Sequence, residues 1–438
     1  MEWRLALISE HASPLALVGG VDAGGQNIAV AELAVHLAKL GYGVDVFTRW
    51  DDASQPETVA WKPGVRVVHV AAGPRAFVPK EELLAYMNEF TTSVEGFIER
   101  ENNPYRLVHA HFFMSGLVAA NLKQTLGLPF VVTFHALGEV RRQLQGSCDT
   151  FPAERLSIEQ RVIREADAVV ALCPQDQDDL IQLYGADPAR LFTIPNGYNP
   201  TEFYPVDKAL ARIMLGLEPT EPVILQLGRM VPRKGVDNVV RALGHLRRTY
   251  GTVARLLIVG GESDEPDPLQ TPEIGRLMQL AEAEGVREWV TFTGRRQRET
   301  LRYYYSAADV FVTTPWYEPF GITPLEAMAC GTPVVGSAVG GIKQTVLDGE
   351  TGFLVPPNDP PALAAKLAAL LYSKKLRTVM SEEAVRHVQE NYTWLDVAQQ
   401  TANLYELVLS GQFTPAKLLR RTIATTQRDA SGLALGKN

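Results

Sequence analysis

Short apolar runs alternate with longer segments of helical periodicity along most of the chain. Continuous apolar runs between amphipathic segments are typical of parallel strands that helices cover on both faces. The first series of predicted strands covers residues 5–8, 44–47, 107–109, 130–133, 168–172 and 191–194. The second series covers residues 223–227, 255–259, 290–292, 310–313 and 334–335. Two such series in succession predict an α/β protein with two doubly wound parallel-sheet domains.

Turn-forming residues mark the break between the two series. Pro195-Asn196-Gly197 and Asn199-Pro200 are strong turn signals, and the next strand pattern opens at Pro222. The predicted divisions are an N-terminal domain over residues 1–198, a second domain over 199–400 with a linker near 197–220, and a C-terminal helix with a basic tail over 401–438.

The composition is that of an ordinary globular protein, with 438 residues of which 46% are hydrophobic and 21% charged. The net charge of -8 argues against nucleic acid or an anionic membrane as the partner of the whole surface. Cys148, Cys173 and Cys330 are too few and too far apart for a disulfide framework, which fits a reducing cytoplasm. The first apolar run is short for a signal peptide, and no stretch reaches the roughly 20 apolar residues that span a bilayer. We therefore expect a cytoplasmic protein without a transmembrane segment.

A glycine-rich loop follows the first predicted strand. It runs from Gly19 to Asn27 and includes Gly24-Gly25 immediately before an amphipathic helix. Glycines let backbone N–H groups approach an anion, and the following helix offers its positive end. The spacing is neither that of the dinucleotide fingerprint nor that of the P-loop. By itself the loop is explained equally well by a plain strand-to-helix turn.

Two cations follow the first strand of the second domain. Arg229 and Lys234 stand five residues apart in the segment that ends at Gly235. Ligands of open α/β sheets bind at the carboxyl ends of the strands, so both side chains could hold a diphosphate there. A basic surface loop is the alternative reading.

Two carboxylates follow the strand predicted at residues 310–313. Glu318 and Glu326 flank the turn Phe320-Gly321-Ile322-Thr323, which leads into a helix. Such a turn directs free N–H groups at phosphate or sugar oxygens, and carboxylates accept hydrogen bonds from sugar and ribose hydroxyls. An acidic residue at a helix start can also be a simple cap.

Together these residues strongly resemble glycosyltransferase family 4, whose members have the GT-B architecture. The matching positions are the glycine pair Gly24-Gly25, the histidine His135, the basic pair Arg229 and Lys234, and the E-x7-E element Glu318 and Glu326. The resemblance covers roughly residues 4–400. It implies two Rossmann-like domains facing a cleft and a nucleotide-sugar-dependent hexosyltransferase whose donor site lies in the C-terminal domain.

Within the family, the chain resembles sucrose-phosphate synthases and the mycothiol-pathway enzymes that act on inositol phosphate. The similar segments are Asp22-Ala23-Gly24-Gly25-Gln26, residues 77–83, and His135-Ala136-Leu137-Gly138 followed by Arg141. The resemblance implies UDP-glucose as donor and fructose 6-phosphate as acceptor, with acceptor contacts from Gln26, Lys80, Arg141 and Arg155.

The sequence also departs from these groups. Arg141 replaces a lysine, Ala136 replaces a hydroxyl residue, and Phe112-Phe113 stand near a tyrosine of the inositol-phosphate enzymes. An inositol phosphate acceptor and a lipid-linked or polysaccharide acceptor therefore remain alternatives. A non-catalytic module that only binds a sugar nucleotide is the alternative of another class.

The family resemblance implies retention of anomeric configuration and assigns the catalytic residues. These are Glu318, His135, Arg229 and Lys234, and the donor contacts are Gly24, Gly25, Arg229, Lys234, Glu318, Phe320, Gly321, Ile322, Thr323 and Glu326. Cations and N–H dipoles can stabilise the departing diphosphate, so we predict no metal and no cofactor besides the nucleotide sugar. Asp176-Gln177-Asp178 has the spacing of a metal-binding DxD motif, but it lies at a predicted helix start, where acidic residues are favoured.

Overall fold

The computed structural model describes residues 3–16, 24–102, 104–146 and 150–411. Within these residues the first half forms an eight-stranded sheet of order β3-β4-β2-β1-β5-β6-β7-β8. The strands are β1 (Arg4–Ile8), β2 (Gly43–Arg49), β3 (Thr58–Lys62), β4 (Val65–Val70), β5 (Tyr105–His111), β6 (Phe130–Thr133), β7 (Ala168–Ala171) and β8 (Leu191–Thr193). All pairs are parallel except β3 with β4 at the sheet edge. The helices are α1 (Gly25–Lys39), α2 (Met87–Arg100), α3 (Phe113–Leu126), α4 (Gly138–Gln145), α5 (Arg155–Glu165) and α6 (Pro174–Tyr184).

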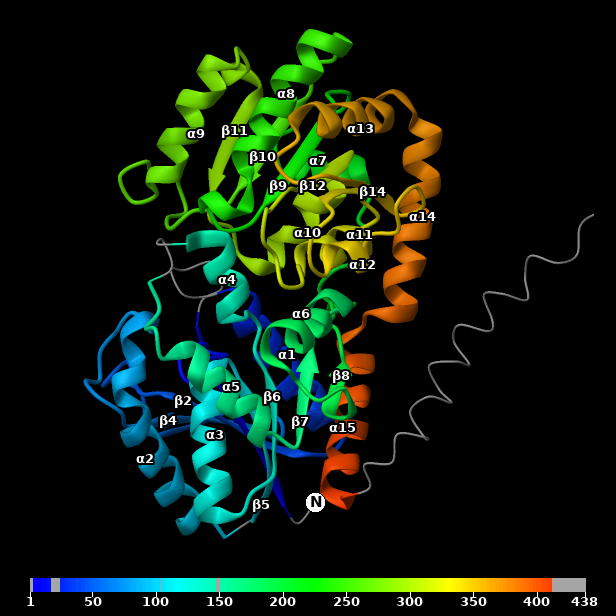
Figure 1. The fold of residues 1–438 in the computed structure, drawn as a ribbon. Helices are drawn as coiled ribbons and strands as arrows, with labels where there is room; N and C mark the ends of the chain where they lie inside the picture. The colour runs from blue at the N-terminus through cyan, green and yellow to red at the C-terminus, as the bar shows by residue number, and fades with distance from the viewer. Residues whose placement is uncertain (1–2, 17–23, 103, 147–149, 412–438) are drawn as a thin grey trace, which may run out of the picture.

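The described part of the second half forms a six-stranded parallel sheet of order β11-β10-β9-β12-β13-β14. Its strands are β9 (Val223–Leu227), β10 (Arg255–Val259), β11 (Val290–Gly294), β12 (Val310–Thr313), β13 (Val334–Ser337) and β14 (Gly352–Val355). The helices are α7 (Lys208–Met214) in the linker, α8 (Val236–Tyr250), α9 (Pro272–Ala283), α10 (Arg298–Ala307), α11 (Thr323–Ala329), α12 (Ile342–Thr345), α13 (Pro360–Tyr372) and α14 (Lys374–Asn391). Figure 1 shows the two domains one above the other, with helices flanking both sheets.

The predicted two-domain α/β architecture is confirmed, and strands lie at every predicted apolar run. The prediction missed β3, β4 and β14. Polar residues stand at the ends of β3 and interrupt β4, whereas β14 is a short apolar run of Gly352–Val355. In β4 the second residue is Arg66, which pairs with the buried Asp45 at 2.6 Å and so remains inside the sheet. A charged residue within a strand conceals that strand from an apolar pattern.

The chain crosses between the domains twice, and the two crossings are hydrogen-bonded to each other. The amide of Tyr198 donates to the carbonyl of Tyr392 at 2.9 Å, and the amide of Trp394 donates to the carbonyl of Tyr198 at 3.1 Å. A Cβ atom on Gly197 would lie 2.9 Å from the Trp394 nitrogen, so the crossing needs a glycine here. The predicted linker therefore begins at a fixed junction.

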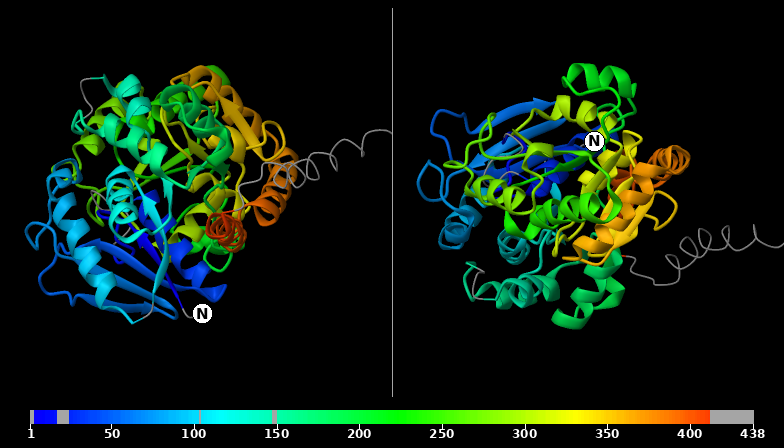
Figure 2. Two further views of the ribbon diagram at one scale, coloured as in Figure 1. Left: turned by 60° about the horizontal axis from the view of Figure 1, so that its bottom comes forward. Right: turned by 90° about the horizontal axis from the view of Figure 1, so that it is seen from above.

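The predicted boundary between residues 400 and 401 is wrong, because it falls inside helix α15 (Trp394–Ser410). This helix leaves the C-terminal domain and packs on α1 and β5 of the N-terminal domain (Figure 1). Its buried face includes Trp394 and Tyr405, which are 1% and 0% exposed. Figure 2 shows α13 and α14, the orange helices that precede α15, at one side of the molecule in both views. The predicted basic tail lies outside the described residues.

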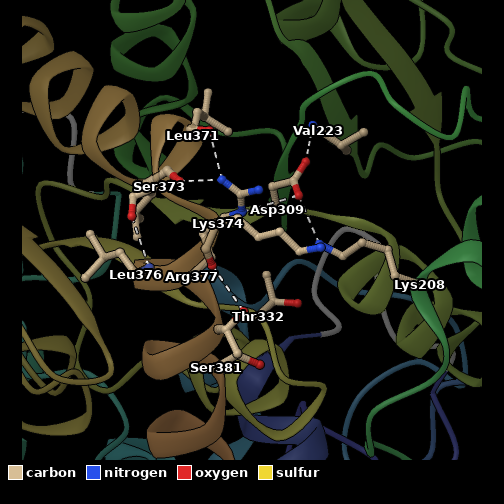
Figure 3. A network of polar contacts seen from close by, with 12 residues as sticks. Lys208, Val223, Asp309, Thr332, Leu371, Ser373, Lys374, Leu376, Arg377 and Ser381 are labelled. Carbon is tan, nitrogen blue, oxygen red and sulfur yellow. Dashed lines mark hydrogen bonds and ion pairs between the residues drawn. The ribbon is translucent and has the colours of Figure 1, made fainter.

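A buried carboxylate fastens the linker to the C-terminal domain. Asp309 precedes β12 and accepts hydrogen bonds from the Lys208 ammonium at 3.0 Å and the Val223 amide at 2.9 Å (Figure 3). It also accepts a hydrogen bond from the Arg212 guanidinium at 2.9 Å. Arg377 of α14 approaches it to 3.6 Å. Burial alone would raise the pKa of Asp309, but Lys208, the Val223 amide and Arg212 hold it below its ordinary value.

We expect Asp309→Asn to lower the free energy of unfolding by about 3 kcal/mol, because it leaves the buried Arg212 without its carboxylate. Urea unfolding measures this change. The control is Glu383→Gln, which removes an exposed partner of Arg386 on α14 and should change the free energy of unfolding far less, because solvent screens such a pair. Equal losses in the two variants would contradict the anchoring role of Asp309.

No helix within the described ranges is both long and apolar enough to cross a membrane.

Candidate active site

The cleft lies where the carboxyl ends of the two sheets face each other. His111 ends β5, the loop after β6 carries His135, and the loops after β9 and β12 approach from the other domain. This is the place where open α/β sheets bind ligands. Two adjoining cavities fill the cleft, here named the donor-side cavity and the acceptor-side cavity.

The donor-side cavity is formed mainly by the C-terminal domain. It is lined by Gly24, Gly25, Ile28, residues 227–230, Arg233, Lys234, residues 259–262, Arg295, Arg296, Arg298, Leu301, Glu318, residues 321–323 and Glu326. All the predicted donor contacts line it except Phe320, which lines the acceptor-side cavity. The sequence motifs therefore converge in one place, although they come from segments far apart in the chain.

The acceptor-side cavity lies between the domains. It is lined by His11, residues 24–27, Lys80, Phe112, His135, Ala136, Arg141, Phe151, Leu172, Asn196, Arg229, Arg233 and residues 317–322. Both cavities share Gly24, Gly25, Arg229, Arg233, Glu318, Gly321 and Ile322. A reacting pair of ligands would meet at this shared wall.

An ion cluster occupies the shared wall. Lys234 ends a short 3₁₀ turn after β9 and donates to the carboxylate of Glu318, while an Arg233 nitrogen lies 3.7 Å from the same oxygen. Burial alone would raise the pKa of Glu318, but Lys234, Arg233 and Arg229 together hold it below its ordinary value. Burial lowers the pKa of Lys234, and Glu318 opposes that shift. Glu318 is thus an ionised acceptor in a site with an excess of positive charge.

The second carboxylate of the E-x7-E element has protein partners. Glu326 is 2% exposed and accepts hydrogen bonds from Arg298 at 2.9 Å and from the Tyr305 hydroxyl at 2.9 Å. Arg298 also donates to Glu202 at 2.6 Å. Sequence reasoning missed Arg298 and Tyr305, because both belong to α10, a segment without a motif of its own.

A glycine pair supports the loop that carries Glu318. Gly340 has φ 46°, and a Cβ atom there would lie 1.8 Å from the Glu318 carbonyl oxygen. The amide of Gly341 donates to the carbonyl of Pro319 at 3.2 Å. Sequence reasoning missed this pair too, although adjacent glycines after a strand are a turn signal.

Three of the four predicted acceptor contacts line the acceptor-side cavity: Gln26, Lys80 and Arg141. The Gln26 amide donates to the Ser9 hydroxyl at 3.2 Å and the His111 carbonyl at 3.3 Å, which fixes its orientation. Asn27 accepts a hydrogen bond from the Gly24 amide at 2.9 Å and so holds the start of α1. The part of the predicted glycine loop before Gly24 lies outside the described residues.

Arg155 does not line the acceptor-side cavity. It is 2% exposed, donates to Glu159 at 2.8 Å and to the Ala136 carbonyl at 2.6 Å. Its guanidinium carbon lies 5.0 Å from the Phe112 ring and 4.6 Å from the Phe151 ring, both of which do line the cavity. The structure thus places Arg155 beneath an aromatic wall, where it can orient the two rings by cation–π contact.

The DxD segment lies at a helix start, as predicted. Helix α6 begins at Pro174, and the carboxylate of Asp176 accepts a hydrogen bond from the Leu172 amide at 2.9 Å. Burial raises the pKa of Asp176 to about 7. Capping explains this residue.

Comparisons with known proteins identify the family. The model of the glycosyl transferase 4-like domain matches residues 24–197, and that of glycosyl transferases group 1 matches residues 207–387. D-inositol 3-phosphate glycosyltransferase 2 of Catenulispora acidiphila is 37% identical over 92% of this chain and 94% of its own. The chain belongs to glycosyltransferase family 4. As a member, it is a nucleotide-sugar-dependent hexosyltransferase. Membership disfavours the alternative of a module that only binds a sugar nucleotide.

Further similar proteins include a second inositol-phosphate enzyme and solved structures with other names. D-inositol 3-phosphate glycosyltransferase of Rhodococcus erythropolis is 36% identical over 92% of this chain and 90% of its own. The structure of sucrose-phosphate synthase from Thermosynechococcus elongatus has a TM-score of 0.85 and 35% identity, with 94% of this chain and all of that chain covered. The Anabaena protein HepE in complex with UDP-glucose shares the fold at 20% identity and a TM-score of 0.72, over 92% of this chain and 99% of its own. The predicted GT-B fold and both predicted family likenesses are confirmed.

Proposed function

We propose that this family 4 member transfers glucose from UDP-glucose to a phosphorylated sugar, with fructose 6-phosphate as the first candidate. One observation supports a phosphorylated acceptor. The acceptor-side cavity is lined by four cations, Lys80, Arg141, Arg229 and Arg233, and among its described lining residues Glu318 is the only carboxylate. Such a cavity favours an anionic ligand over a neutral sugar.

The ion cluster supports transfer with retention of configuration. A double displacement needs a carboxylate nucleophile beside the anomeric carbon. Glu318 is held by Lys234 and suits an acceptor of sugar hydroxyls better than a nucleophile. We infer a same-face substitution in which the bond from C1 to the diphosphate breaks and the bond to the acceptor hydroxyl oxygen forms. The hydroxyl proton then passes to the departing phosphate oxygen, while Arg229 and Lys234 stabilise its charge.

Inositol phosphate is the second candidate, since relatives named for that acceptor are 37% identical to this chain. The aromatic wall is a departure of this chain from the inositol-phosphate enzymes. Phe112 stands near a tyrosine of the inositol-phosphate enzymes and offers an apolar ring over Arg155 in place of a hydroxyl. A sugar face can pack on this ring, with its phosphate at Lys80 and Arg141.

The test is radiolabelled transfer from UDP-glucose to fructose 6-phosphate, free fructose, inositol 3-phosphate, free inositol and a membrane extract. We expect kcat/KM for fructose 6-phosphate to exceed that for free fructose by about 100-fold, because free fructose lacks the phosphate that would contact the cations of the cavity. The product should be α-configured by NMR. Transfer to inositol 3-phosphate alone, or to lipid alone, would overturn the assignment.

A matched pair of variants tests the phosphate contact itself. Arg141→Met should raise KM for the phosphorylated acceptor about tenfold and leave KM for UDP-glucose unchanged. Arg142→Met is the control, because this neighbour on α4 is exposed and does not line the cavity. Equal effects of the two substitutions would show that Arg141 does not bind the acceptor.

A further inference from the structure

Three histidine rings form a stack that leads from the core to the acceptor-side cavity. His109 and His111 stand two residues apart on β5 and therefore share one face of the strand. Their ring centroids lie 4.3 Å apart, and His111 lies 5.2 Å from His135 on the neighbouring loop. His109 and His111 are 2% and 1% exposed, whereas His135 lines the cavity. The stack therefore has one end buried and one end at the cleft.

Hydrogen bonds fix the rings of the stack. His111 Nδ1 and His135 Nε2 lie 2.9 Å apart. His109 bonds the Tyr405 hydroxyl through Nδ1 at 2.6 Å and the Thr133 hydroxyl through Nε2 at 2.9 Å. Tyr405 belongs to α15, so the returning helix locks the buried end of the stack.

Each ring of the stack is neutral at physiological pH. Burial lowers the pKa of His109 and of His135 to about 3 and that of His111 well below its ordinary value. Other rings of the stack add to the shift of His109 and His111, and His11 adds to that of His135. A neutral imidazole carries one proton, and the nitrogen without it is an acceptor. In the bond between His111 and His135, one ring therefore donates and the other accepts.

The remaining nitrogen of His111 decides the direction of that bond. Its Nε2 is buried and has no hydrogen-bond partner among the described residues. A proton there would be a buried N–H without an acceptor, which costs more than a bare lone pair. The proton of His111 therefore belongs on Nδ1, which donates to His135 Nε2. His135 must then carry its own proton on Nδ1.

The backbone at His135 is consistent with a functional constraint. His135 has φ 58°, in the left-handed region that residues with a side chain rarely occupy. A conformation of this kind costs about 1 kcal/mol or more and is concentrated at functional sites. It presents the ring to the cleft while Nε2 stays bonded to His111.

We propose that His111 is a positioning residue that fixes His135 as the Nδ1–H tautomer, so that His135 acts in the cleft only as a hydrogen-bond donor to a sugar or phosphate oxygen. The donor role toward substrate rests on the proposed function, whereas the tautomer does not. A ring that is protonated on Nδ1 and accepts the His111 proton on Nε2 has no free lone pair with which to remove the acceptor proton. This leaves the departing phosphate as the proton acceptor.

NMR of the full-length protein with ¹⁵N-labelled histidine rings tests the tautomer directly. We expect a protonated Nδ1 and an unprotonated Nε2 for both His111 and His135, with the signals assigned from His111→Asn and His135→Asn. A proton on His135 Nε2 would overturn the proposal. This measurement needs no acceptor, so its outcome is independent of whether fructose 6-phosphate is the substrate.

Kinetics with the acceptor found in the transfer panel test the consequence. His111→Leu removes the donor and should lower kcat about tenfold, the size of one lost hydrogen bond, with KM for both substrates near wild type. His111→Asn retains an amide donor and should recover most of kcat. The control is His69→Asn, since His69 bonds the Pro56 carbonyl away from the cleft. Equal losses in His111→Leu and His111→Asn, with an unchanged His135 tautomer, would reduce His111 to a packing residue and contradict the proposal.

Discussion

Glu318→Gln is expected to lower kcat more than about 30-fold, equivalent to about 2 kcal/mol of transition-state stabilisation. The Glu318 side chain is 13% exposed, and its carboxylate is paired with Lys234 in the wall that the two cavities share. An amide of the same shape cannot neutralise Lys234 and brings an N–H₂ group into a site already rich in donors. The dissociation constant for UDP should change little, because the predicted contact of Glu318 is with the sugar and not with the nucleotide.

Steady-state kinetics and calorimetry with UDP measure the two quantities separately. The control is Glu350→Gln, a substitution at an exposed position in the same domain, which should leave both within about twofold as surface changes usually do. Unchanged turnover of Glu318→Gln would exclude the role assigned to this carboxylate. An equal loss of UDP affinity would place Glu318 on the nucleotide.

A double-mutant cycle separates the ion pair from the individual residues. Lys234→Met alone should lower kcat about 100-fold or more, since it removes one preorganised cation from the leaving group. Combined with Glu318→Gln, the loss should fall short of the sum, because the two side chains contact each other. Strict additivity would show that the contact has no energetic consequence for the reaction.

Much of the fold and of the donor site could be predicted because the responsible patterns are local. Buried parallel strands such as β6 and β9 are continuous apolar runs, and their ends carry the motifs. Arg229, Lys234 and Glu318 could be assigned to one pocket since parallel strands place their carboxyl ends at the same edge. Residues that are far apart in the sequence thus lie together in the folded protein.

The missed features depend on partners from distant segments. No local pattern indicates that Arg155 lies against the rings of Phe112 and Phe151, or that Arg298 reaches Glu326. The return of α15 depends likewise on the surface of α1, which its own sequence does not reveal. By contrast, the spacing of His109 and His111 was a usable signal, because alternate residues of a strand share a face, although the predicted strand ended at residue 109 and the observed one ends at His111.

The glycine pair after β13 supports the loop that carries Glu318. Gly340→Ala is expected to lower kcat/KM about 100-fold, as a misplacement of about 1 Å in a reacting group can do. A Cβ atom at this position would lie 1.8 Å from the carbonyl oxygen and 3.0 Å from the carbonyl carbon of Glu318, so the backbone of that residue must move. Displacement of this backbone also disturbs the contact of the Glu318 side chain with Lys234.

Gly349→Ala is the matched control, because it separates the clash at Gly340 from the conformational cost of a left-handed alanine. Gly349 has φ 83° in the same domain, and nothing lies within 4 Å of a Cβ atom built there. Both variants lose about 1 kcal/mol of stability from the left-handed backbone, and thermal unfolding measures that shared loss. Kinetics at a temperature where both remain folded then isolates the displacement of Glu318. If Gly340→Ala is as active as Gly349→Ala, the loop does not depend on this contact. A selective loss of turnover shows that the packing of two backbone segments, outside every recognisable motif, sets the position of the carboxylate.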